Sequence, residues 1–176
     1  SQDVETDDNV LRQTTARLPW LLIGMIGGIG NSMILGNFDA TFAAHPEMAL
    51  YIPLIGGTGG NVGTQSSAII VQGLANSSLD AKNTFKQVTK EAVVALINAT
   101  IISLLVYTYN FIRFGATATV TYSVSISLFA VVMFASIFGT LVPMTLEKLK
   151  IDPAIATGPF IAITNDIVKM KKHLLE

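Results

Sequence analysis

Long apolar stretches alternate with short polar segments along almost the whole chain. About 20 apolar residues cross the hydrocarbon core of a bilayer as a helix. Each backbone N–H and C=O in lipid must find its partner within the protein, which favours helices for such stretches. The pattern therefore predicts an all-α membrane protein, a bundle of five transmembrane helices. The five stretches cover residues 20–35, 48–74, 92–112, 122–146 and 154–170.

Composition supports this assignment to a membrane. The chain is 51% hydrophobic and 13% charged, whereas a soluble domain has about 25% charged residues. A chain of 176 residues has too small an interior to bury so much apolar surface, so we expect much of it to face lipid. The predicted division is a polar N-terminal segment, residues 1–18, and a transmembrane pore domain, residues 19–176.

The remaining composition excludes several kinds of site. The net charge of −1 gives no indication of a nucleic-acid partner. The absence of Cys excludes disulfides, thiolate metal sites and Cys nucleophiles.

Lys and Arg residues give the expected orientation. They occur before the first stretch, in the loop of residues 72–90 and just after the fourth stretch. The loop of residues 37–47 has none, and the loop after the third stretch has only Arg113. Basic residues mark the cytoplasmic side, so the N-terminus is predicted to be cytoplasmic and the C-terminus outside. The basic tail of residues 169–173 argues for the opposite orientation.

Several carboxylates border the apolar stretches, and one lies inside a stretch. Glu91 is interpreted as opening the third helix, where an acid interacts favourably with the helix dipole. Asp166 lies inside the fifth stretch, and a carboxylate at membrane depth costs at least about 2.5–3.5 kcal/mol. Such a residue usually faces a wet cavity and has a function. The alternative is that Asp166 lies near the outer interface and pairs with Lys169.

The fifth stretch places a candidate cation site around this carboxylate. Gly158, Ala162 and Asp166 are four residues apart, so they share one helix face. Pro159 removes a backbone hydrogen bond and leaves a carbonyl free near the start of the helix. Oxygen ligands of this kind suit hard cations such as Mg²⁺ or Ca²⁺. Close helix packing is the alternative explanation for the two small residues.

The second stretch has the densest run of glycine and polar residues. Five glycines fall within residues 56–63, and each would cost about 1 kcal/mol in a soluble helix. At membrane depth they permit close backbone approach or a local break that lines a cavity. A phosphate-binding loop is a poor alternative because its lysine is absent. The candidate pore-lining residues are Gly59, Gly60, Asn61, Gly63, Thr64 and Gln65.

In three blocks the sequence resembles the transmembrane domain of the MgtE family of magnesium channels and transporters. The blocks are RLPWLL at residues 17–22, the run of residues 53–65, and residues 152–160 with Asp166. The resemblance implies a homodimer in a prokaryotic plasma membrane, with a pore on its two-fold axis lined by the second and fifth helices. It also implies that Asp166 lies at the central ion site, with Gly158 and Ala162 facing the same ion.

The sequence departs from the family pattern after Asp166, where Lys169, Lys171 and Lys172 stand in place of apolar residues. It also departs at residue 158, which is often Asn in the family and is Gly here. That ligand role then passes to backbone or water. About 18 residues precede Pro19, whereas most members have a magnesium-sensing region there. Either this member has no such region, or the sequence is a piece of a longer protein. Only in the first case is transport expected to respond little to cytosolic Mg²⁺.

The expected function is transport of Mg²⁺, with the ion held hydrated by Asp166 and backbone carbonyls. The alternatives are an alternating-access carrier of divalent cations and a membrane assembly subunit that transports nothing. An intramembrane hydrolase, from a different class, would need a second deep carboxylate or a Ser–His pair, and His45 and His173 lie near helix ends. The chain is therefore not expected to be an enzyme.

Overall fold

A computed structural model describes residues 9–150, and every regular element in that range is a helix. The expected all-α class is confirmed for these residues. The chain divides into two units, residues 1–45 and residues 46–176, which we describe separately.

The first unit contains α1 (Val10–Gly36) and the short α2 (Asp39–Ala44). The backbone N–H of Leu11 donates to Asn9 Oδ1 at 3.3 Å and caps the start of α1. The helix thus begins ten residues before the apolar stretch that predicted it, because hydropathy marks only the apolar part of a helix. The predicted domain boundary after residue 18 falls inside α1 and stays a prediction about which part enters lipid.

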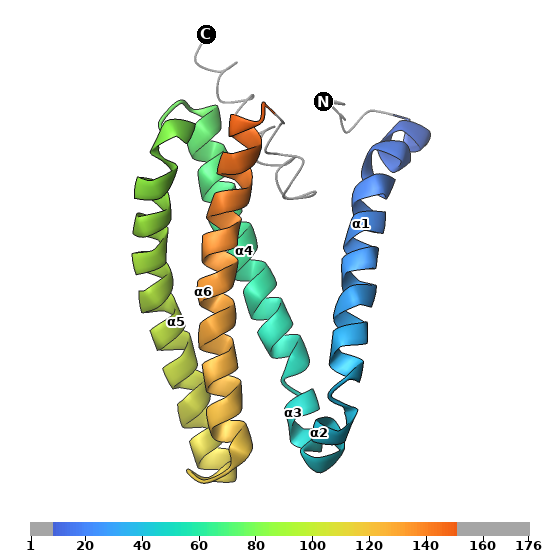
Figure 1. Ribbon diagram of the computed structural model, residues 1–176, viewed down its shortest axis with the longest axis vertical. Coiled ribbons are helices and arrows are strands. Elements are labelled where there is room, and N and C mark those ends of the chain that lie inside the picture. The colour runs from blue at the N-terminus through green and yellow to red at the C-terminus, as the bar shows by residue number, and fades with distance from the viewer. Residues whose placement is uncertain (1–8, 151–176) are drawn as a thin grey trace. The chain divides into compact units, whose positions relative to one another are not determined.

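The second unit contains three long helices, and α6 packs along both of the others (Figure 1). The short helix α3 precedes α4, and the 3₁₀ helix η1 precedes α5. The elements are α3 (Pro46–Ala49), α4 (Ile52–Ala75), η1 (Ala81–Asn83), α5 (Thr84–Phe114) and α6 (Thr119–Lys148).

The stretch of residues 48–74, predicted as a single helix, is divided in the structure. The helix α3 ends at Ala49, a turn follows, and α4 begins at Ile52. Pro53 has no N–H to donate to the carbonyl of Ala49, four residues earlier, so a continuous helix would lose a hydrogen bond here. Pro53 instead occupies the first turn of α4, where no intrahelical donor is needed.

The interpretation of Glu91 as the opening residue of a helix is wrong. The helix α5 begins at Thr84, so Glu91 lies seven residues after the start. The dipole effect is confined to the first turn, and a different explanation for this carboxylate is needed.

A line of buried residues on α6 faces the rest of the second unit. These residues recur every four positions and lie on one helix face: Val120, Val124, Leu128, Val132, Ser136 and Thr140. Ile126, Phe134 and Phe138 are more than half exposed on other parts of α6. Large exposed apolar side chains of this kind favour contact with lipid or another protein chain.

Among the described helices, α5 and α6 are long and apolar enough to cross a membrane. The 24 residues of α4 would extend about 36 Å, more than the roughly 30 Å of a hydrocarbon core. Its glycines and amides lower its hydropathy, so composition alone does not mark it as a span. The number of spans and the orientation of the termini stay predictions, and the fifth stretch lies outside the described residues.

Candidate functional site

The helix α4 presents uncovered amide side chains. Asn61 and Gln65 are exposed within the described part of the chain, and they lie one turn apart on the same helix face. Gly60 is also exposed, and no other described helix has an atom within 4 Å of the position that a Cβ would take there. An amide that meets only lipid is costly, so this face is suited to water, an ion or another protein segment.

The glycines of α4 permit close packing, and the helix is unbroken from Ile52 to Ala75. A Cβ on Gly139 of α6 would lie 2.6 Å from the Gly63 carbonyl oxygen and 3.0 Å from Ser66 Cβ. Real Cβ atoms do not approach backbone so closely, so α4 and α6 touch through their main chains at this point. Of the two predicted uses of the glycines, the structure therefore has close approach and no local break.

A proline in α6 creates a second link to α4. Pro143 lies inside α6 and has no N–H for the carbonyl four residues earlier, which belongs to Gly139. Ser67 Oγ donates to that carbonyl oxygen at 2.8 Å. The hydroxyl of α4 thus satisfies an acceptor that α6 itself leaves free.

A hollow of about 390 Å³ lies along the α4–α6 contact. Four of the six candidate pore-lining residues border it, whereas Asn61 and Gln65 do not. Its lining residues are Gly59, Gly60, Gly63, Thr64 and Ser67 of α4 with Ala135, Phe138, Gly139 and Val142 of α6.

A buried carboxylate joins the three long helices. Glu91 of α5 is only 8% exposed, and its Oε1 accepts a hydrogen bond from Ser66 Oγ of α4 at 2.6 Å. Ser66 Oγ also lies 3.3 Å from Ser136 Oγ of α6. This cluster was not predicted from the sequence. The available signal was that a purely apolar run follows Glu91 directly.

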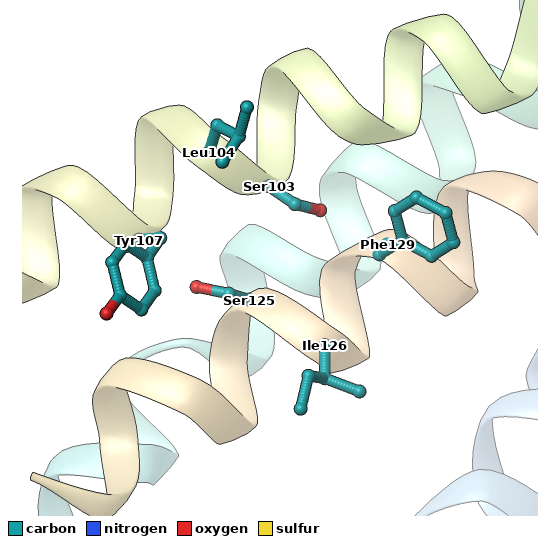
Figure 2. Close-up of a pocket in the computed structure, with 6 residues that line it drawn as sticks. All are labelled: Ser103, Leu104, Tyr107, Ser125, Ile126 and Phe129. Carbon is teal, nitrogen blue, oxygen red and sulfur yellow. The ribbon is translucent and has the colours of Figure 1, made fainter. Parts of the chain in front are cut away.

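A second hollow, of about 260 Å³, lies between α5 and α6. Figure 2 shows its lining: Ser103, Leu104, Tyr107, Ser125, Ile126 and Phe129. Ser125 Oγ donates to the Thr121 carbonyl of its own helix at 2.9 Å. With no carboxylate in its lining, this hollow offers a divalent cation few ligands.

The predicted ion ligands Gly158, Ala162 and Asp166 lie outside the described residues. Within residues 9–150, no three His, Cys, Asp or Glu side chains are grouped closely enough to hold a metal ion. The described residues thus provide a polar helix face and its supports, while the predicted ligands belong to the C-terminal stretch.

Long apolar helices with exposed side chains, packed against a helix that has an exposed amide face, define a helical membrane protein. The family described as MgtE, divalent cation transporter, matches residues 52–170. The chain belongs to this family, as its second-helix and last-helix motifs predicted.

Three curated relatives are similar to nearly the whole chain. The magnesium transporter MgtE of Bacillus subtilis (strain 168) is 30% identical over 96% of this chain and 37% of its own length. The magnesium transporter MgtE of Thermus thermophilus is 31% identical over 90% of this chain and 35% of its own length. The protein of the same name from Enterococcus faecalis is 28% identical over 94% and 36%. The chain spans little more than a third of the length of these relatives.

Proposed function

We propose that this chain transports Mg²⁺ across a membrane. The observation that carries the proposal is the family match over residues 52–170, which includes both α4 and Asp166. The relatives named as magnesium transporters support Mg²⁺ as the cargo. No enzymatic role is proposed.

The proposed path runs along the two-fold axis of a homodimer in a prokaryotic plasma membrane. The exposed Asn61 and Gln65 of α4 support this. Their amides need hydrogen-bond partners in a membrane, and either a partner chain or the water of an ion path would provide them. The segment of residues 154–170 completes the lining. One Asp166 per chain offsets half the charge of Mg²⁺, and two across the axis offset all of it, so ion binding and dimerisation depend on each other.

The ion passes through the site largely hydrated. Mg²⁺ releases water reluctantly and usually keeps several water ligands. Asp166 supplies the charge, and backbone carbonyls near Gly158 and Ala162 accept hydrogen bonds from the water shell. In the absence of cation the two carboxylates would repel each other.

Cation flux into lipid vesicles tests this proposal. Asp166→Asn keeps the shape of the side chain and removes its charge, and Mg²⁺ flux should fall at least about tenfold at equal protein incorporation. The matched control is Glu147→Gln at the exposed end of α6, which also removes one carboxylate and should leave flux unchanged. Undiminished flux through well-folded Asp166→Asn would refute the assigned site.

A further inference from the structure

The buried carboxylate Glu91 is not explained by the proposed ion path. Its hydrogen-bond partner is the hydroxyl of Ser66, and among residues 9–150 no ammonium or guanidinium group is paired with it. Burying a carboxylate with only a hydroxyl as its partner costs folding free energy. We therefore expect a carboxylate at the junction of three helices to have a function.

The hydrogen bonds of this cluster form a chain of donors that ends at the Glu91 carboxylate. Ser66 has a single hydroxyl proton, which it gives to Glu91 Oε1 at 2.6 Å. At 3.3 Å, Ser136 can then donate to the Ser66 oxygen. The Ser66 side chain is thus fixed from both sides, by α5 through Glu91 and by α6 through Ser136.

Ser66 directly follows residues 59–65 of α4, which contain the candidate pore-lining residues. Because a helix is stiff, the rotation imposed at Ser66 also sets the direction in which Gln65 and Asn61 point, each within about one and a half turns. The next residue, Ser67, donates from its Oγ to the Gly139 carbonyl oxygen of α6 at 2.8 Å. Two neighbouring serines therefore hold the C-terminal half of α4 against α5 and α6.

We propose that Glu91 is a positioning residue for transport: through Ser66 it fixes the rotation of α4 so that the Asn61–Gln65 face meets the ion path. This inference rests on the proposed function. It assigns Glu91 a role through geometry and not through contact with the ion. Buried polar contacts are suited to this task because they specify one arrangement, whereas apolar packing tolerates several.

A disulfide reports the α4–α6 register directly. A Cβ on Gly63 would lie 3.9 Å from Ala135 Cβ, which is within the range for a disulfide. The chain contains no Cys, so Gly63→Cys/Ala135→Cys introduces the only pair. The measurement is the rate of oxidative cross-linking in lipid.

The variants separate the hydrogen bond from the charge. Glu91→Leu and Ser66→Ala each remove the bond and should slow cross-linking about tenfold, as expected for loss of one buried hydrogen bond. Glu91→Gln keeps an acceptor oxygen and should cross-link at the unsubstituted rate. Ser125→Ala is the matched control, because within residues 9–150 the hydroxyl of Ser125 bonds only the Thr121 carbonyl of its own helix.

The same substitutions, made without the Cys pair, are then compared by their ratio of Mg²⁺ to Ca²⁺ flux. Ser66→Ala should change the ratio severalfold, and Glu91→Gln should restore what Glu91→Leu loses. An unchanged cross-linking rate in Ser66→Ala would overturn the inference, as would slower cross-linking with an unchanged flux ratio. Loss of flux in Glu91→Gln with normal flux in Ser66→Ala would also overturn it, because the charge would then act on the ion directly.

Failure of the proposed function gives a different result. If the unsubstituted chain passes no cation, the transport proposal fails. The cross-linking rates still decide whether Glu91 fixes the register of α4.

Discussion

Gly139→Ala should destabilise the contact between α4 and α6. The added Cβ would lie 2.6 Å from the Gly63 carbonyl oxygen and 3.0 Å from Ser66 Cβ. Neither atom is the flexible end of a side chain, so the two helices must move apart. Overpacking of this kind costs about 1–3 kcal/mol, and the move would also stretch the bond from Ser67 to the Gly139 carbonyl.

A matched glycine isolates this cost. Gly57 of α4 has no atom of another described helix within 4 Å of its Cβ position, so Gly57→Ala adds the same methyl group without a clash among these helices. Both substitutions gain about 1 kcal/mol of helix propensity, and this gain cancels when the two variants are compared. Gly139→Ala should therefore be about 1–3 kcal/mol less stable than Gly57→Ala.

Unfolding in mixed micelles, followed by circular dichroism as the denaturing detergent increases, measures this difference. Equal stability of the two variants would refute the close approach of α4 and α6 at Gly139. Greater stability of Gly139→Ala would refute it more strongly, because the added methyl group would then make favourable contacts instead of a clash.

Three further predictions concern the Ser67 hydrogen bond, the exposed Asn61 and the dimer. Ser67→Ala should cost about 1–3 kcal/mol by leaving the Gly139 carbonyl unsatisfied, and adding Pro143→Ala, which restores an N–H, should recover part of that loss in the same unfolding assay. Asn61→Ala should lower Mg²⁺ flux without lowering stability, because its side chain is exposed within the chain; a variant that is less stable but transports normally would contradict this. The mass of the purified protein in lipid nanodiscs should be that of a dimer, and an active monomer would contradict the shared site.

The helices of the second unit could be predicted largely from hydropathy. Apolar runs placed α5 and α6 within eight residues of their observed ends, because apolar composition extends over most of each helix. The turn before Ile52 was missed although Pro53 indicated it. Hydropathy contains no information on backbone hydrogen-bond donors. The start of α4 is set by the N–H that proline lacks.

The candidate site was predicted only in part. The unusual glycine content of α4 was visible in the sequence, but the sequence does not show that Gly63 meets Gly139, because that contact depends on how two helices cross. Glu91 was given a local explanation, whereas its partner Ser66 lies on a different helix. Tertiary pairing of this kind cannot be found from spacing along one segment.

Mg²⁺ uptake into liposomes that contain the purified 176-residue chain tests the central claim most directly. A magnesium-sensitive dye inside the liposomes reports entry after Mg²⁺ is added outside, with protein-free liposomes as the baseline. The account predicts uptake well above that baseline for the unsubstituted chain and uptake near the baseline for Asp166→Asn. Uptake at the baseline for the unsubstituted chain, or equal uptake for both proteins, would contradict it.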